Sequence, residues 1–150
     1  MAFLSVENQN EIKKMFEELG GDVRLQFFTQ HESPIIVPGM DCPTCKDTRQ
    51  LLEEAATLSD KLHLEVHELR EDEPLAAEHD IPRLPALVMT ADGVNGKVRY
   101  FGLPSGYEFS VLIGSILDVS KAQADLSDET MEVLNGLDKD LHIQVFVTPS

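Results

Sequence analysis

Several features that define other classes of protein are missing from this 150-residue chain. No stretch approaches the roughly 18 consecutive apolar residues of a membrane-spanning helix, so we expect no membrane span. The first residues have neither a basic segment nor a sustained apolar run. We therefore expect no secretory signal, and we interpret the chain as a cytoplasmic protein.

Positive charge is also scarce. The chain has 27 acidic residues against 12 lysines and arginines, which gives a formal net charge of -15. This charge repels the phosphates of nucleic acids and of anionic membranes over about one Debye length. We therefore expect neither a nucleic-acid partner nor a membrane partner, and we interpret the charge mainly as a source of solubility.

Cysteine occurs only twice, at Cys42 and Cys45, in the sequence Cys-Pro-Thr-Cys. Two cysteines are too few for the disulfide scaffold of a small secreted protein. A bond between them would close so short a loop that it would restrict the unfolded chain very little. The pair therefore indicates chemistry and not structural stabilisation.

The expected order of elements indicates an α/β unit over residues 1–121. Ser5 can cap a first helix, whose apolar residues follow helical spacing up to Leu19. Residues 30–40 contain two prolines and a glycine, and we expect a loop there. The other segments indicate strands at 23–29, 62–67, 86–90 and 98–101, and helices at 43–58, at 74–79 and from Ser105, which has capping-box spacing to Glu108. The last two strands should form an antiparallel hairpin, and the whole order predicts a mixed sheet covered by helices.

Residues 122–150 predict a further helix, from Ser127 to Leu137, and a further strand, from Leu141 to Thr148. Here the chain begins to repeat itself: residues 22–26 read Asp-Val-Arg-Leu-Gln, and residues 140–144 read Asp-Leu-His-Ile-Gln. Each of these segments follows an amphipathic helix. The second segment is either the truncated start of another copy of the same unit or a chance likeness between two apolar strands.

The Cys-x-x-Cys pattern at the start of a helix is suited to disulfide exchange. Such exchange needs one accessible thiolate and a second thiol that displaces the mixed disulfide. Just after a strand, Cys42 would lie at the amino end of a helix, where the helix dipole stabilises a thiolate and lowers the pKa of the thiol. Cys45, nearly one turn further on, would then be the resolving thiol.

A zinc site is the chemical alternative, because His63 and His67 follow the two cysteines. The spacing does not favour it. The separation between Cys45 and His63 exceeds that of classical zinc fingers, and two histidines four residues apart on a strand lie about 13 Å from each other. We expect both histidines to face solvent and no metal to be bound.

Pro85 is the second clue to the chemistry, because it directly precedes a predicted strand. At that position a proline cannot donate a ladder hydrogen bond, and it can adopt the cis form. Taken alone, this is only a proline at the entry of a strand.

A Cys-x-x-Cys after the first strand of a sheet and a proline before the third, in this element order, resemble the thioredoxin and glutaredoxin superfamily. The resemblance covers nearly the whole chain. It implies a thioredoxin-like fold: a central four-stranded mixed sheet flanked by helices, here with an extra N-terminal helix. It also implies that Pro85 is cis and packs beside the cysteines, that the backbone of Leu84 pairs with substrate, and that Pro43 and Thr44 contribute to substrate binding.

Two features narrow the resemblance: the helix before Val23, and residues 102–109, which read Gly-Leu-Pro-Ser-Gly-Tyr-Glu-Phe. Both resemble the glutaredoxin-like protein disulfide oxidoreductases, which carry two thioredoxin-like units in tandem. A related pair of units forms the N-terminal region of alkyl hydroperoxide reductase flavoproteins. The chain departs from this pattern in its longer loop at 30–40.

These observations together predict a thiol-disulfide oxidoreductase that exchanges a disulfide of Cys42 and Cys45 with protein substrates. The resemblance implies an upstream thiol or flavoprotein as reductant, and nothing in the sequence calls for a cofactor. Two alternatives stay open: a redox-inactive adaptor or docking domain that uses the same fold, and a glutathione-dependent glutaredoxin. The sequence does not indicate an oligomeric state.

Overall fold

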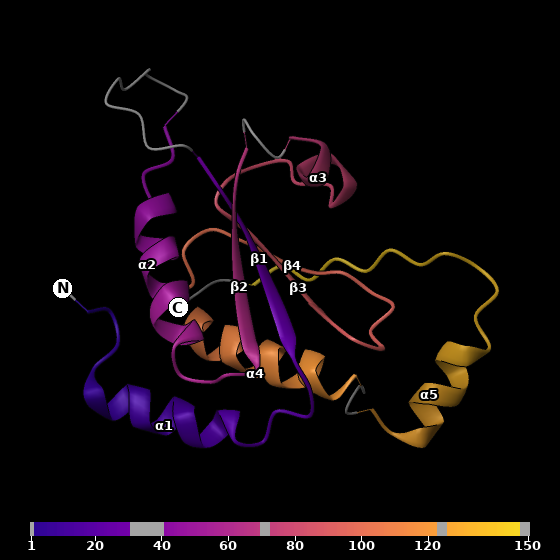
Figure 1. Ribbon diagram of the computed structural model, residues 1–150. Helices are drawn as coiled ribbons and strands as arrows, with labels where there is room; N and C mark the ends of the chain where they lie inside the picture. Colours follow the sequence, from indigo (N-terminus) through magenta and orange to yellow (C-terminus); the bar gives the residue numbers. More distant parts are fainter. Residues whose placement is uncertain (1, 31–40, 70–72, 123–125, 148–150) are drawn as a thin grey trace.

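The computed structural model describes residues 2–30, 41–69, 73–122 and 126–147. The expected loop at 30–40 falls almost wholly outside these residues. Within them the elements follow the predicted order up to the last helix (Figure 1). Their bounds are α1 Val6–Phe16, β1 Val23–Thr29, α2 Cys45–Ala56, β2 Leu62–Glu68, α3 Glu73–Glu78, β3 Ala86–Ala91, β4 Val98–Phe101, α4 Tyr107–Lys121 and α5 Asp128–Asn135.

The four strands form one mixed sheet in the order β2-β1-β3-β4. β1 pairs with β2 in parallel, whereas β3 is antiparallel to both β1 and β4. The register of β1 against β3 places Phe28 opposite Ala86, so the end of β1 meets the beginning of β3. The predicted four-stranded mixed sheet and its β3–β4 hairpin are confirmed.

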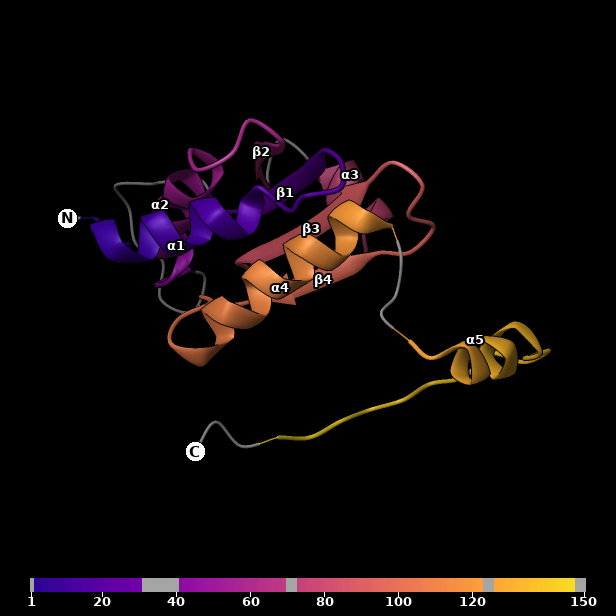
Figure 2. The same ribbon diagram turned by 90° about the horizontal axis from the view of Figure 1, so that it is seen from below.

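Helices cover both faces of this sheet, because successive strand residues point to opposite sides. Val23, Leu25 and Phe27 of β1 belong to a large core under α1, α2 and α4. Phe28 points the other way and forms a smaller core with Ala76 of α3. Figure 2 shows α1 and α4 lying side by side on one face, with the strands behind them. The sheet is thus covered by helices on both faces, as expected of a thioredoxin-like fold.

α1 is the extra N-terminal helix that the sequence predicts. The hydroxyl of Ser5 accepts a hydrogen bond from the backbone N–H of Asn8, which caps the helix as expected. The side chains of Ile12 and Phe16 are buried on the face of α1 that is turned toward the sheet. The carboxylate of Glu54, on α2, accepts hydrogen bonds from the backbone N–H groups of Phe3 and Leu4, at 2.9–3.0 Å and 3.0 Å. These contacts fasten the start of the chain to the helix that follows the redox pair.

α4 begins one residue later than a cap at Ser105 predicts, so that expectation is wrong. The residue before the helix is Gly106, whose φ of 59° lies in the left-handed region that glycine favours. Ser105 is therefore one residue too far from the helix to cap it, and the carboxylate of Glu108 accepts a hydrogen bond from the hydroxyl of Tyr100 instead.

Among the described residues, no helix combines the length and the apolar character needed to cross a bilayer.

The segment after α4 differs from the rest of the chain. α5 forms as predicted, with the hydroxyl of Ser127 accepting a hydrogen bond from the N–H of Thr130. The strand expected from Leu141 is absent over residues 141–147, because no neighbouring strand offers the hydrogen bonds that a strand requires. Figures 1 and 2 show α5 apart from the sheet, and Ile143 and Phe146 are 81% and 88% exposed.

The close approach of α1 to α4 predicts a difference between two adjacent glycines. A Cβ on Gly20 would lie 2.9 Å from the carbonyl oxygen of Ser120, a backbone atom that cannot yield without moving the end of α4. We expect Gly20→Ala to lower the free energy of unfolding by about 1–3 kcal/mol, as overpacking does. Gly21→Ala is the matched control, because its Cβ would lie at an ordinary 3.5 Å from the same oxygen. Equal midpoints of urea unfolding in the two variants would contradict this expectation.

The Glu54 contact predicts a pH-dependent contribution to stability. Partial burial acts to raise the pKa of Glu54, but hydrogen bonds from Leu4, Gln50 and Phe3 outweigh it and hold the pKa below its ordinary value of 4.5. The resulting stabilisation is present above pH 4.5 and is lost as the pH falls through the lower, folded-state pKa.

We expect Glu54→Gln to lower the free energy of unfolding by about 1 kcal/mol at pH 7, and by progressively less below pH 4.5. Unfolding of both proteins by urea across this pH range measures the difference. Glu53→Gln is the control, since it removes an exposed ion pair with Arg49 on the same helix. A difference between wild type and Glu54→Gln that stays constant with pH would be inconsistent with the proposed contact.

Candidate active site

The topology of the sheet brings the predicted site residues to one end of it. β1 and β2 are parallel, so α2, which connects them, runs back antiparallel to both strands. Its amino end therefore lies where β1 and β2 end (Figure 1). Because β3 is antiparallel to β1, Pro85 lies at this same end, one residue before the pair of Ala86 with Phe28. Cys42 and Cys45 precede Pro85 by 43 and 40 residues in the sequence, yet all three thus lie at one end of the sheet.

Cys42 and Cys45 form a disulfide with an S–S distance of 2.03 Å and a Cα–Cα distance of 5.4 Å. The two sulfurs differ in their surroundings. Cys45 is only 5% exposed and belongs to the buried face of α2, whereas Cys42 is half-buried. The Cys-x-x-Cys segment therefore offers the first cysteine to solvent and keeps the second in the interior.

The backbone turns at this disulfide before α2 begins. We expected the helix to start at Pro43, but its first residue is Cys45 and its cap is Thr44, so the expected start is two residues too early. The N–H of Cys45 donates to the carbonyl of Cys42 at 3.3 Å, which makes residues 42–45 a turn that leads into the helix. Further on, the buried Thr48 donates its hydroxyl to the carbonyl of Thr44 at 2.8 Å and ties the turn to the helix.

The peptide bond between Leu84 and Pro85 is cis, as the resemblance implies. Pro85 is buried and Leu84 is half-buried. The carbonyl of Pro85 accepts a hydrogen bond from the N–H of Gly102 at 3.0 Å, just after β4. Gly102 has a φ of 104°, which a side chain would strain, so glycine suits this turn. The proline segment is therefore held between the start of β3 and the end of β4.

The small core under α3 supports the same end of the sheet. Phe28 is fully buried, and the ring of His67 stacks on it with centroids 5.2 Å apart. His79 contacts the same ring at 5.9 Å and is 8% exposed. The expectation that His67 faces solvent is wrong, because its neighbour across the sheet is an aromatic ring, whereas His63 is exposed as expected. Among the described residues, no group of three His, Cys, Asp or Glu side chains is placed to hold a metal ion.

Sequence reasoning missed one contact at this end of the sheet. The guanidinium of Arg83 lies over the ring of Phe101, with Cζ 5.2 Å from the ring centroid. Both residues border the proline segment, Arg83 before it in the chain and Phe101 beside it on β4. The position of an arginine two residues before the key proline was the only available signal, and the aromatic partner lies too far along the chain to be paired with it from sequence.

Comparison with known families decides the classification. A family model described as "Thioredoxin domain" matches residues 34–114, which is more than half of the chain. The chain belongs to the thioredoxin domain family. The resemblance to the thioredoxin and glutaredoxin superfamily is thereby confirmed, together with the thioredoxin-like fold.

The curated relatives of this thioredoxin-family chain are much longer proteins. An alkyl hydroperoxide reductase component of Xanthomonas campestris pv. phaseoli is 29% identical over 110 residues, which are 73% of this chain and 19% of that protein. The protein of the same description from Staphylococcus aureus is 22% identical over 145 residues, 97% of this chain and 24% of the relative. The chain thus spans about a fifth to a quarter of the length of these relatives.

Solved structures show the same fold at low sequence identity. A protein disulfide oxidoreductase from Aeropyrum pernix superposes with a TM-score of 0.73 at 24% identity, covering 89% of this chain and 55% of that one. The corresponding alkylhydroperoxide reductase component of Enterococcus faecalis also gives a TM-score of 0.73, at 18% identity, over 91% of this chain and 62% of its own. Both structures extend well beyond the region that they share with this chain.

The unequal burial of the two sulfurs predicts unequal reactivity after reduction. We expect iodoacetamide to alkylate Cys42 first, because Cys45 is 5% exposed and reaches the reagent only through local opening. Mass spectrometry of peptides from protein that was reduced and briefly alkylated would give the order. Urea-unfolded protein is the control, in which both cysteines should react alike, and equal rates in the folded protein would rule out the proposed asymmetry.

Proposed function

We propose that this chain is a thiol-disulfide oxidoreductase that exchanges the Cys42–Cys45 disulfide with protein substrates. The observation that carries the proposal is the bond between these two residues in a thioredoxin-family fold. Its position supports the same conclusion, since the bond lies at the end of the sheet that also holds the cis peptide bond of Pro85. A disulfide that closes so short a loop adds little stability, so exchange is the use that remains for it.

In the reducing direction the cycle has two exchange steps. The thiolate of Cys42 attacks one sulfur of the substrate disulfide, so a Cys42–substrate bond forms and the second substrate sulfur leaves as a thiolate. The thiolate of Cys45 then attacks the sulfur of Cys42 and releases the first substrate sulfur. Two electrons pass to the substrate, and the protein returns to the disulfide form. The same steps in reverse oxidise a substrate dithiol.

The asymmetry of the pair supports the two roles that we propose. Cys42 is the half-buried member, which an incoming disulfide can reach, and Cys45 is the buried one, which attacks only the adjacent sulfur of Cys42 once that sulfur is bound to substrate. The amino end of α2 follows directly, and its unpaired backbone N–H groups favour a nearby thiolate. Lys46 adds positive charge next to the pair, whereas Asp41 and Asp47 oppose it.

We assign the docking of substrate to the residues around the disulfide, which in the proposed role form a groove. Pro43 is exposed and Thr44 is half-buried in the turn between the cysteines, so both can border a bound polypeptide. Leu84 precedes the cis bond at the start of β3, and we assign its backbone to pairing with an extended substrate segment. Pro85 shapes the wall of the groove beside the disulfide. We base these four roles on the family resemblance and on the position of all four residues at the same end of the sheet.

The electron donor is proposed from the relatives. The curated relatives are described as components of alkyl hydroperoxide reductase, and this chain matches only a part of them. We propose that the whole protein takes electrons from an upstream thiol or flavoprotein reductase. The chain itself contributes the dithiol that passes them on.

We further propose that residues 1–121 are one thioredoxin-like domain and that residues 122–150 begin a second. α5 repeats the serine cap of α1, and the apolar side chains that follow it are exposed, as expected of a segment that lacks its partner strands. The A. pernix structure extends beyond the shared region by nearly half of its length. A natural stop codon directly after Ser150 would contradict this division.

Reduction of insulin with dithiothreitol as electron source tests the proposed function. We expect wild-type protein to accelerate the reduction and Cys42→Ser to leave only the background rate of dithiothreitol, because the attacking sulfur is gone. Reduced Cys45→Ser, mixed with insulin after the dithiothreitol has been removed, should instead accumulate a mixed disulfide between Cys42 and substrate, which mass spectrometry detects, because the resolving sulfur is gone.

The same experiment separates the alternatives. Undiminished activity of Cys42→Ser would refute the assignment of the nucleophile. An inactive wild type whose Cys42 thiol titrates near the free value of about 8.5 would indicate the redox-inactive adaptor. Turnover of glutathione disulfide but not of insulin would indicate a glutathione-dependent enzyme.

A further inference from the structure

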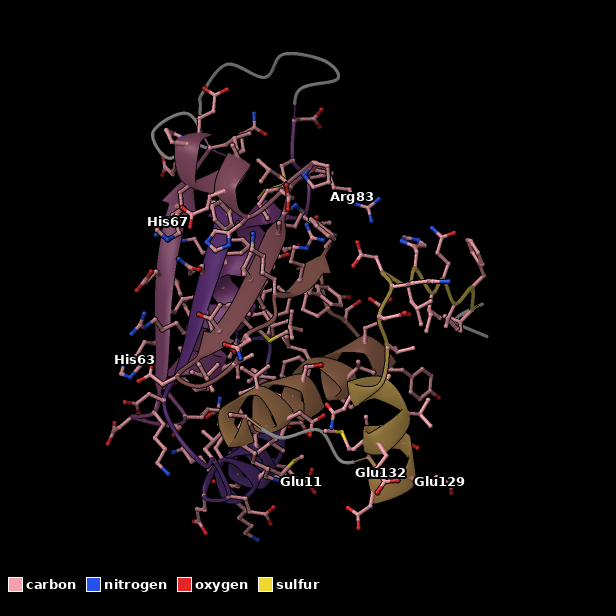
Figure 3. All side chains as sticks on the ribbon, turned by 90° about the vertical axis from the view of Figure 1, so that its right-hand side faces the viewer. Glu11, His63, His67, Arg83, Glu129 and Glu132 are labelled. Atoms are coloured by element: carbon pink, nitrogen blue, oxygen red, sulfur yellow. A yellow bond between two sulfur atoms is a disulfide. The ribbon has the colours of Figure 1, made fainter. Side chains whose placement is uncertain are left out.

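Arg83 is an exposed cation at the mouth of the proposed groove. It lies two residues before Pro85 and directly before Leu84, whose backbone we assign to substrate pairing. Figure 3 shows its side chain pointing outward from the end of the sheet that also carries His67, whereas His63 marks the opposite end of β2. A substrate that lies along Leu84 must therefore pass close to this guanidinium.

The ring of Phe101 holds the side chain of Arg83 in place. Cζ of Arg83 lies over this ring at 5.2 Å from the centroid. Phe101 is itself fixed, because its Cα pairs with that of Ala86 across the sheet and the next N–H, of Gly102, donates to the carbonyl of Pro85. A cation held over an aromatic ring uses no hydrogen-bond donor in that contact, so the N–H groups of the guanidinium can still donate to a carboxylate. The contact with Phe101 thus restrains the side chain of Arg83 without occupying its N–H donors.

Arg83 differs from the other arginines in having no acidic partner. Within residues 2–30, 41–69, 73–122 and 126–147, its guanidinium makes no ion pair, although the chain carries 27 acidic residues. The other arginines of these ranges each lie within 4 Å of a carboxylate: Arg24 of Asp92 at 3.9 Å, Arg49 of Glu53 at 2.8 Å and Arg99 of Asp80 at 3.8 Å. An uncompensated charge on so acidic a chain is available to a carboxylate from outside.

We propose that Arg83 makes this protein selective for protein disulfides with an acidic side chain close to the reacting cysteine, an inference that rests on the proposed function. The planar guanidinium matches the two oxygens of a carboxylate. The ion pair forms when the substrate docks, and it takes no part in the exchange of electrons. Elsewhere the acidic surface repels such a substrate, so Arg83 also determines the orientation in which an acidic segment can approach.

A set of matched peptide disulfides tests the proposal. Each peptide carries one mixed disulfide, and a single residue within three positions of its cysteine is Glu, Gln or Lys. The readout is kcat/KM for reduction by the wild-type protein with dithiothreitol as electron source. We expect at least one position where Glu is preferred over Lys by about fivefold, the discrimination that an exposed ion pair supplies. The preference should shrink as salt is added.

Two substitutions of Arg83 give the decisive comparison. Arg83→Gln should abolish the preference at that position, and Arg83→Glu should reverse it in favour of Lys. Arg24→Gln is the matched control, because Arg24 is exposed and paired near the opposite end of β1, and its loss changes the net charge by the same amount. It should keep the wild-type preference. A loss of preference in the Arg24 variant would assign the effect to net charge and overturn the role of Arg83.

The remaining outcomes separate this inference from the proposed function. Equal kcat/KM for all peptides in the wild type, or an unchanged preference in Arg83→Gln, would overturn the selectivity while leaving the oxidoreductase intact. If Arg83→Gln changed only the rate of reduction of glutathione disulfide, the carboxylate that Arg83 binds would belong to glutathione. This result would overturn the proposed selectivity for protein disulfides. Failure of the wild type to reduce any peptide, with Cys42→Ser no different, would overturn the proposed function itself.

Discussion

The parallel pairing of β1 with β2 determines where chemistry can occur on this fold. A parallel pair requires a crossover, and the crossover helix α2 must begin where both strands end. The antiparallel entry of β3 brings Pro85 to the same place. Without the parallel pair, the Cys42–Cys45 disulfide and the cis peptide bond would be two unrelated local features. With it, they become neighbouring parts of one sheet end.

The two hydrophobic cores stabilise different sides of this end of the sheet. The large core under α1, α2 and α4 holds the buried face of α2, and with it Cys45, so one sulfur of the pair stays inside. The small core around Phe28 supports the other side, where Leu84 and Phe101 flank the proline segment. The inner parts of this end of the sheet are thus packed, while Cys42 is half-buried and Pro43 and Arg83 are exposed.

The net negative charge of the chain and the position of Arg83 act together on acidic partners. The acidic surface repels acidic partners over about a Debye length. At short range, the guanidinium of Arg83, which lies over the ring of Phe101, offsets this repulsion. In the proposed role, this combination selects a partner by a single carboxylate near its disulfide.

Periodicity and motif spacing were enough to predict the helices and strands up to Lys121, the redox pair and the key proline, because these features depend on neighbours a few residues away. The cis bond came from family resemblance. Two features that the sequence misjudged depend on distant partners: His67 lies against Phe28 across the sheet, and residues 141–147 form no strand without another to pair with. The cap expected at Ser105 fails for a local reason, because Gly106 takes the left-handed conformation directly before α4. The contact of Arg83 with Phe101 likewise exists only once β3 and β4 are paired, because residues so far apart in the sequence meet only in the folded chain.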